Sequence, residues 1–410
     1  MGGNAYYHCD FIQTRGVRVR PSQPKALSVN KISVTTIFLA LAGKLVNAPF
    51  VAGQFQSSAG VLANYFFDAT ILVAVLVGSR RIQTQFVPIF AAALTTALAY
   101  CVSTLILGDG AIMTALSNHL RVYLPLLAFP LLLASYSASP EWFIGWVRRI
   151  CMLVCALILA GLFFFPESNN RSEIWWPSYF GGLHTTAYVA LLLAVLVYCL
   201  HLKGKVGVVM AASGILVVSA SIFFGWGVRT ATIATTLFVI AVIARKIKQR
   251  GLVISTMSVA AVTLLSIYIV FFFDIDRLDL LTSGRIAMYG EKYNQIAGHS
   301  LAQWLIGAGA GSDLIESDVW WWAEKGAHSD LITMLVEGGI VYLAGFLLTL
   351  WTIFRGGGFV SKGLILAALF TSIVSNGIYV RPMVSYLLVI ALAIVYAHDS
   401  QNGRRVSSVA

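Results

Sequence analysis

The sequence predicts an all-α fold, a polytopic transmembrane helical bundle of about twelve membrane-spanning helices with one large external helical loop. Of the 410 residues, 58% are hydrophobic and only 11% are charged, with a mean hydropathy of +0.82. This composition leaves too little polar surface to cover a water-soluble globule of that size. Apolar runs of about 17 to 25 residues recur between Ile32 and His398, and each is long enough to cross a bilayer as a helix.

The expected spans follow one another with mostly short turns. They are 33–50, 60–78, 86–107, 120–137, 144–165, 181–201, 206–226, 229–246, 252–273, 329–353, 359–377 and 382–398. Together they form a transmembrane domain over residues 32–398, between a basic segment over 1–31 and a tail over 399–410. The first segment is too long and polar for an ordinary cleaved signal peptide, so we expect the first span to be an uncleaved anchor. Residues 274–327 form a long hydrophilic connection, which suggests a functional loop.

The distribution of basic residues predicts the orientation. Lys and Arg near span ends are retained on the cytoplasmic side. With both termini cytoplasmic, most of the 28 Lys and Arg residues fall on that side, and the loop 274–327 faces outward. The net charge of +11 is then explained by this bias and by attraction to anionic membrane lipids. It does not indicate a nucleic-acid partner.

Two charged residues, Lys44 and Asp68, fall well inside the first two spans. An unpaired charge at such a depth costs about 3 kcal/mol. In an antiparallel hairpin the two residues differ in depth by roughly 3 Å. We therefore expect a structural ion pair, with a catalytic or ion-conducting role as the alternative.

No metal site is expected. Cys151 and Cys155 share a helix face, but no His or acid lies near them in the sequence, so packing explains them better. The motif Asp274-Ile275-Asp276 resembles the Asp-x-Asp metal sites of soluble nucleotide-sugar transferases, yet it lies directly at the end of a span. None of the five cysteines is placed to form an exported disulfide.

Six reactive side chains collect on the predicted outer side, most of them at a membrane boundary. They are Arg171, His184, Arg229, Arg285, His328 and Arg381. Any single Arg at a span end is explained equally well by snorkelling to the interface. The set as a whole is better explained by a site.

The most specific pattern opens the tenth span. It reads Gly326-Ala327-His328-Ser329-Asp330, followed by Gly339 and Tyr342. On a continuous α-helix, Gly339 and Tyr342 lie within about 40° of the His328 face, whereas Glu337 points roughly the opposite way. We therefore expect no direct role for Glu337 beside His328. Ser329 or a neighbour can cap the helix, whose amide end would attract an anion.

The arrangement His-Ser, nine residues, Gly, two residues, Tyr resembles the signature of bacterial O-antigen ligases, which O-antigen and exopolysaccharide polymerases share more loosely. Three other stretches are similar to the same superfamily. They are Thr282-Ser283-Gly284-Arg285 with the later Gly-rich run Leu305–Gly311, Gly227-Val228-Arg229-Thr230, and Gly182-Leu183-His184-Thr185. Val228 stands where the family has Ser, and Thr-Thr follows His184 where Pro-Asn is usual.

The resemblance implies a GT-C-like glycosyltransferase of the bacterial inner membrane with a periplasmic active site and no metal or cofactor. It would move a saccharide from undecaprenyl pyrophosphate to a hydroxyl of lipid A-core, as a ligase, or of a growing polysaccharide, as a polymerase. His328 would be the general base, since an imidazole titrates near neutral pH. Arg229 and Arg285 would stabilise the pyrophosphate, because Arg offers permanent charge and a fixed fork of donors.

The remaining candidate residues are assigned to binding or structure. Substrate binding is expected of His184, Arg171, Arg381, Trp320, Trp321, Trp322 and Tyr342, and a structural role of Gly339. For the tryptophans, a membrane-interface belt is an equally good explanation. A flippase for lipid-linked oligosaccharides is the alternative function, although the bases outside the cytoplasmic segments gather mainly at one edge, which favours a one-sided reaction.

Overall fold

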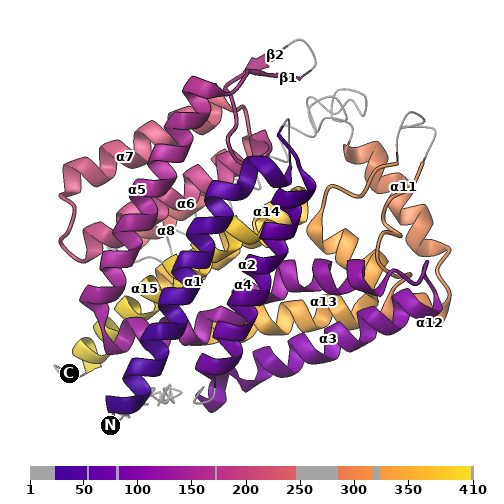
Figure 1. The fold of residues 1–410 in the computed structure, drawn as a ribbon, viewed down its shortest axis with the longest axis horizontal. Helices are drawn as coiled ribbons and strands as arrows, with labels where there is room; N and C mark the ends of the chain where they lie inside the picture. Colours follow the sequence, from indigo (N-terminus) through magenta and orange to yellow (C-terminus); the bar gives the residue numbers. More distant parts are fainter. Residues whose placement is uncertain are drawn as a thin grey trace, which may run out of the picture.

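The computed structural model describes residues 24–52, 55–79, 83–170, 173–245, 285–316 and 324–407. These residues form a helical bundle with one small hairpin (Figure 1). The helices are α1 (Pro24–Val51), α2 (Ser58–Gly78), α3 (Val87–Ile106), α4 (Ile112–Ala138), α5 (Pro140–Phe164), α6 (Leu183–Leu202), α7 (Val208–Ala220), α8 (Arg229–Ala244), α11 (Arg285–Ala297), α12 (Leu301–Ile306), α13 (Asp330–Gly356), α14 (Phe359–Val374) and α15 (Pro382–Ser407). A 3-10 turn (Thr84–Phe86) precedes α3, a π-helical turn (Ser221–Gly225) follows α7, and β1 (Ser168–Asn170) pairs antiparallel with β2 (Glu173–Trp175).

The helices confirm a helical membrane protein. Within the described residues, nine helices are long and apolar enough to cross a bilayer, and α8 and α14 are shorter apolar helices. Every expected span corresponds to a described helix except 252–273, which lies outside the described residues. One boundary differs clearly: α4 begins at Ile112 rather than at residue 120. Polar residues in its first turns interrupt the apolar run but not the helix.

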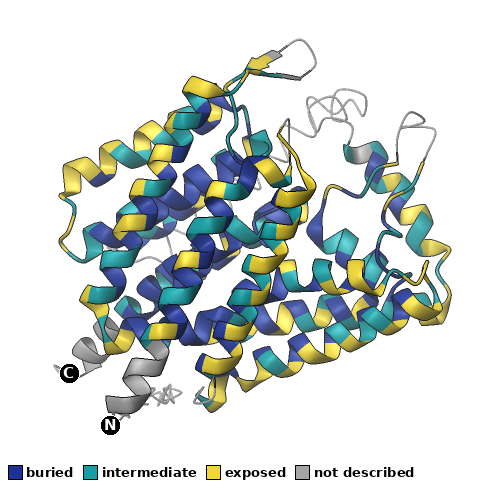
Figure 2. Cartoon of the chain, viewed as in Figure 1, coloured by how far each residue is buried: buried dark blue, intermediate teal, exposed yellow. Residues whose placement is uncertain are grey.

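The apolar surface is arranged as lipid exposure requires. α6 and α15 lie at the centre of the bundle and are largely buried, whereas α3, α5 and α7 present exposed apolar side chains outward (Figure 2). Phe163 and Phe164 of α5 are 78% and 79% exposed, and Val209 of α7 is 75% exposed. Large apolar side chains at such exposure are stable in lipid and unfavourable in water.

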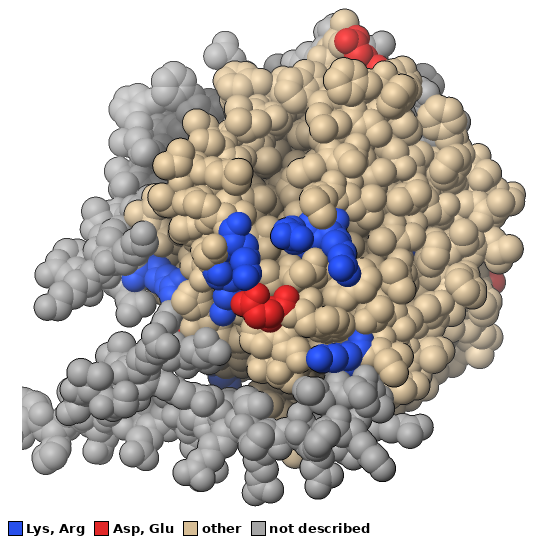
Figure 3. Space-filling view, turned by 60° about the vertical axis from the view of Figure 1, so that its left-hand side comes forward, with Lys and Arg blue, Asp and Glu red and all other residues tan. Residues whose placement is uncertain are grey.

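Basic side chains gather on one face. In Figure 3 the Lys and Arg residues surround a small acidic group, while the rest of this face carries few charges. At the neighbouring ends of α4, α5 and α6, Lys205 pairs with Glu141 at 2.8 Å, and Lys203 and Arg149 lie over the rings of Tyr136 and Trp146. The placement of these ends on the cytoplasmic side stays a prediction.

The expected ion pair between α1 and α2 is present. Lys44 Nζ donates to Asp68 Oδ1 at 2.6 Å, with Lys44 1% and Asp68 14% exposed. Asn64, one turn earlier on α2, also donates to Asp68, at 3.5 Å. The pair therefore joins two spans that carry no other Lys, Arg, Asp or Glu beyond residue 31.

Neutralising either partner should destabilise this hairpin. We expect Lys44→Met or Asp68→Asn to reduce the free energy of unfolding by about 3 kcal/mol, because each leaves one buried charge unpaired. The double exchange Lys44→Asp with Asp68→Lys should recover most of that loss. Thermal unfolding in nanodiscs measures both effects, and an exchange variant no more stable than the single variants would rule out a structural pair.

Candidate functional site

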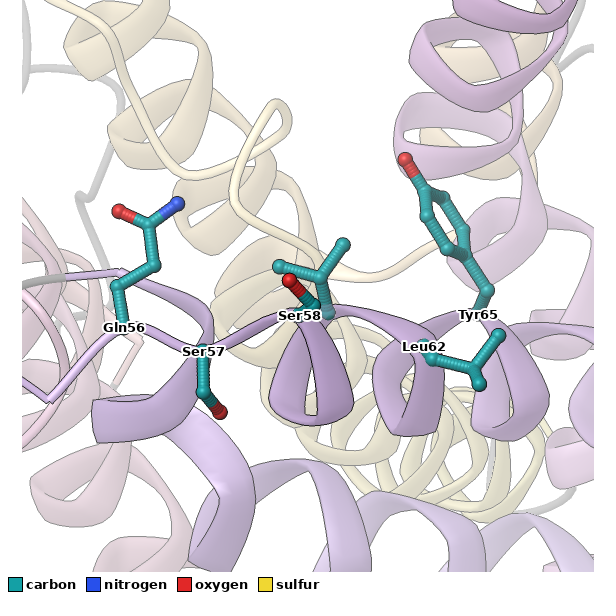
Figure 4. A pocket seen from close by; sticks show the side chains of 6 residues that line it. Gln56, Ser57, Ser58, Leu62 and Tyr65 are labelled. Atoms are coloured by element: carbon teal, nitrogen blue, oxygen red, sulfur yellow. The ribbon is translucent and has the colours of Figure 1, made fainter.

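A cavity of about 620 Å³ opens where α3, α4, α13 and the external loop meet. In Figure 1, α3 and α13 run side by side, and α11 and α12 lie near their right-hand ends. The polar residues that line it are Tyr100, Thr114, Asn118, Arg121, Asp313, Glu324, Lys325, His328, Asp330, Thr333, Glu337, Tyr342 and Asn376. A second hollow, of about 490 Å³, lies at the start of α2 and is lined by Gln56, Ser57, Ser58, Val61, Leu62 and Tyr65 (Figure 4). Because no charged side chain lines that hollow, it offers little to an anionic substrate.

His328 is exposed at the cavity, two residues before α13 begins. Its backbone φ of +51° lies in the left-handed region, which costs an ordinary L-residue on the order of 1 kcal/mol. Both neighbours are anchored: Ala327 N donates to Asp313 Oδ2 at 2.9 Å, and Ser329 Oγ donates to the carbonyl of Ser372 at 3.1 Å. These contacts hold the strained histidine in place.

The expected capping arrangement at α13 is different in the structure. Ser329 is at the N-cap position, but its side chain makes no cap hydrogen bond. Its hydroxyl donates to the carbonyl of Ser372. Asp330 is in the first turn, as expected, and it is 1% exposed. Its carboxylate accepts from Gly377 N at 2.9 Å. The start of α13 is therefore attached to the turn between α14 and α15.

A buried network supports the loop that carries His328. Lys292 of α11 is 1% exposed, and its Nζ lies 3.0 Å from Asp313 Oδ1. The other carboxylate oxygen of Asp313 accepts from Thr333 Oγ1 at 2.7 Å as well as from Ala327 N. One carboxylate thus connects α11, the segment before His328 and the first turn of α13.

Two of the predicted arginines are close to His328. Arg285, the first residue of α11, donates to the carbonyl of Val374, and Arg381 donates to the carbonyl of Asn376 at 3.1 Å and to Thr185. Both therefore attach to the chain at or beside the turn between α14 and α15. Desolvation within the cavity, followed by the positive charges of Arg285 and Lys325, lowers the pKa of His328 below its ordinary 6.5. The imidazole is therefore neutral at pH 7 and able to accept a proton.

His184 belongs to the same group. It lies in the first turn of α6, and Arg381, Arg285 and His328 act on it electrostatically. Its neighbour Thr185 accepts the hydrogen bond from Arg381. The structure therefore brings together four of the predicted site residues, namely His328, Arg285, Arg381 and His184.

Arg229 is placed less directly. It is the exposed first residue of α8. Like Arg285, Arg381 and His184, it is not among the described residues that line the cavity. The next residue, Thr230, is hydrogen-bonded to Tyr188 at 2.8 Å, and Arg381 lies over the Tyr188 ring at 5.8 Å. Arg229 thus lies next to Thr230, which contacts this group through Tyr188. Arg171 and Trp320, Trp321 and Trp322 lie outside the described residues.

Gly339 allows the Gly-rich run of the external loop to approach α13. Its φ is +67°, which interrupts the helix with a kink. A Cβ there would lie 2.4 Å from Gly307 N, and a Cβ at Gly307, whose φ is +83°, would lie 2.1 Å from the carbonyl oxygen of Glu337. Ala308 N and Gly309 N donate to the carbonyls of Val336 and Glu337 at 2.9 and 3.0 Å. Both glycines are required by this backbone contact.

Gly339→Ala should detach the loop from α13. The substitution combines an unfavourable φ with a backbone clash, so we expect a loss of about 2 to 4 kcal/mol of stability and faster proteolysis of the loop. Gly290→Ala is the matched control, because a Cβ at Gly290 on α11 meets nothing within 4 Å. Thermal unfolding and limited proteolysis test both. Equal behaviour of the two variants would contradict the proposed role of Gly339.

Glu337 was expected to point away from His328, and this expectation is wrong. Glu337 lines the same cavity. Its carboxylate accepts from the hydroxyl of Tyr100 and from Gly311 N. The helical phase was counted from His328, but α13 begins only at Asp330, so that phase does not extend back to the histidine.

Tyr342 lines the inner part of the cavity and is 4% exposed. Its ring lies edge-on to Tyr100, His119 and Tyr123, with centroid distances of 5.2 to 5.7 Å. Packing of this kind stabilises the wall, and only part of the side chain faces the cavity.

Sequence reasoning missed several lining residues. Tyr100 and Arg121 lie in segments that the sequence pattern predicts only as apolar spans, and Thr114 and Asn118 lie in the turn expected before the span 120–137. One pattern in the sequence could have indicated part of this lining. Three polar residues, Thr114, Asn118 and Arg121, recur at helical intervals just before an apolar run, which is typical of one polar helix face. Among the described residues, no group of three His, Cys, Asp or Glu side chains is arranged to hold a metal ion.

Comparison with known proteins adds no family. No protein-family model matches the chain, and no curated protein does.

Proposed function

We propose that this protein is a membrane glycan transferase that moves a saccharide from undecaprenyl pyrophosphate to an acceptor hydroxyl at the periplasmic face of the bacterial inner membrane. The observation that carries the proposal is the exposed His328, held in a strained backbone conformation, with its pKa lowered by desolvation and by Arg285 and other nearby cations. The cations that act on His328, namely Arg285, Lys325 and Arg381, suit a reaction with an anionic leaving group. The acceptor is lipid A-core for a ligase or a growing polysaccharide for a polymerase.

The chemistry follows from the residue types. His328 accepts the proton from the acceptor hydroxyl while the oxygen attacks the anomeric carbon of the donor sugar. The bond between that carbon and the pyrophosphate oxygen breaks, and its electron pair leaves with the pyrophosphate. Arg285 and Arg381 stabilise the charge that develops there, because their guanidinium groups keep their charge and donate in pairs. Arg229 and His184 contact the donor in this proposal.

Product identification tests the proposal. The full-length protein, purified in nanodiscs, is incubated with an undecaprenyl-pyrophosphate-linked repeat unit, with and without lipid A-core. Glycan on lipid A-core indicates a ligase, and chains of several repeat units without that acceptor indicate a polymerase. Translocation of the lipid-linked donor across the bilayer with no new glycosidic bond would instead support a flippase.

A further inference from the structure

The outer end of α4 presents a polar stripe to the cavity. Thr114, Asn118 and Arg121 are spaced at i, i+4 and i+7, so they lie on one face of the helix, and all three line the cavity. We call these three residues the α4 stripe. Asn118 and Glu337 are both hydrogen-bonded to the hydroxyl of Tyr100. The stripe therefore continues into the polar floor of the cavity.

Arg121 is the charged member of the α4 stripe. It is the sole Lys, Arg, Asp or Glu of α4, and its side chain is exposed. Among the described residues, Lys44, Lys292 and Arg245 each have a carboxylate partner within 4.0 Å, whereas no such partner is found for Arg121. A charge within a span that no protein group compensates indicates a functional position.

The surroundings leave the stripe positive. Arg121 acts electrostatically on Lys44, whose own charge is neutralised by Asp68 at 2.6 Å. Two cations and one anion leave one positive charge at this end. Four acids also line the cavity, Asp313, Glu324, Asp330 and Glu337, but among the described residues none of them lies within 4.0 Å of Arg121. Asp313 pairs instead with Lys292 at 3.0 Å. An unused cation facing a cavity is suited to bind an anion.

The stripe is separate from the arginines proposed to hold the pyrophosphate. The cations that act on His328 are Arg285, Lys325 and Arg381, which belong to the external loop and the turn before α15. Arg121 belongs to α4, acts electrostatically on Lys44 of α1, and is not among the charges that act on His328. A substrate that reached both places would need a second anionic group at some distance from the reacting centre.

We propose that the α4 stripe is a second binding subsite, which takes a carboxylate or phosphate substituent carried by the glycan donor or by its acceptor. Arg121 supplies the charge, and Asn118 and Thr114 supply hydrogen bonds. This inference rests on the proposed transferase function, because that function defines the substrates. It predicts that the protein prefers acidic over neutral substrates of the same size.

Binding measured without turnover tests the subsite. The His328→Ala protein in nanodiscs is titrated with two undecaprenyl-pyrophosphate disaccharides that differ only in a terminal glucuronosyl or glucosyl unit. A second pair, lipid A-core with and without its core phosphates, tests the acceptor. We expect one pair to show at least about 10-fold tighter binding of the charged form, as a charge-assisted hydrogen bond predicts. The pair that discriminates identifies which substrate carries the anion.

Substitutions assign the preference to the stripe. Arg121→Gln should abolish the preference for the charged substrate and leave binding of the neutral substrate unchanged. Arg121→Lys should retain a few-fold preference. If the Gln variant does not accumulate, the Lys variant provides the test. Arg149→Gln, at the other end of the bundle over Trp146, is the matched control and should retain the full preference. Equal binding within both pairs, or a preference that survives Arg121→Gln, overturns the subsite. An Arg121-dependent preference in a wild-type protein that forms no glycosidic bond would overturn the transferase function and leave the subsite intact.

Discussion

His328→Ala is expected to reduce kcat for glycan transfer by about a thousand-fold, with little change in membrane abundance. The acceptor hydroxyl is a poor nucleophile until its proton is removed, and a positioned general base contributes roughly 10² to 10⁴ in rate. Steady-state kinetics on purified protein measure the loss. The matched control is His299→Ala, since His299 lies in the same external loop but packs against Trp304 rather than lining the cavity. Normal transfer by His328→Ala would remove the proposed base.

The pH dependence gives an independent test of the same residue. Desolvation and nearby cations lower the pKa of His328, so its neutral form persists below pH 6.5. The acidic limb of kcat/KM should therefore lie below pH 6.5, and activity should fall as the imidazole is protonated. Asp313 acts in the opposite direction on His328, so Asp313→Asn should move the limb to still lower pH. If the acidic limb of kcat/KM does not move in Asp313→Asn, the proposed electrostatic effect of Asp313 on His328 is wrong.

The sequence was sufficient to predict most of the bundle because lipid imposes a simple rule on composition. Runs long enough to cross the bilayer predicted the spans, and the depth of Lys44 and Asp68 predicted their contact, which the structure contains at 2.6 Å. The span at α4 was expected to begin only at residue 120, because Thr114 and Asn118 make the preceding turns appear too polar for a span. In the structure these side chains face a cavity rather than lipid.

The candidate site was predictable only in part, because local backbone geometry departs from the regular helix. Residue types near span ends indicated His328, Arg285, Arg381 and His184, and the structure brings these together. Helical periodicity failed for Glu337, since His328 adopts a left-handed φ and lies outside α13. The network of Lys292 and Asp313 depends on folding of the external loop against α13, a long-range contact that no local pattern encodes.

Arg285→Ala is the second substitution with a large expected effect, a fall of about 10² to 10³ in kcat. Loss of one donor to a developing oxyanion has this magnitude, and Arg285 is one of the cations that act on His328. Arg285→Lys should recover only part of the rate, because a single ammonium replaces a fork of donors. Arg355→Ala, on the exposed last turn of α13, is the control.

A structural role for Arg285 must be separated from the proposed one, since Arg285 also donates to the carbonyl of Val374 and so attaches α11 to the turn after α14. The pH profile distinguishes them. Arg285 lowers the pKa of His328, so its removal should move the acidic limb of kcat/KM of the residual activity to higher pH, opposite to the effect of Asp313→Asn. Displacement of the loop alone would take both charges away from His328 and would not produce shifts of opposite sign. Opposite shifts from these two variants would therefore place a guanidinium and a carboxylate on either side of one functional imidazole.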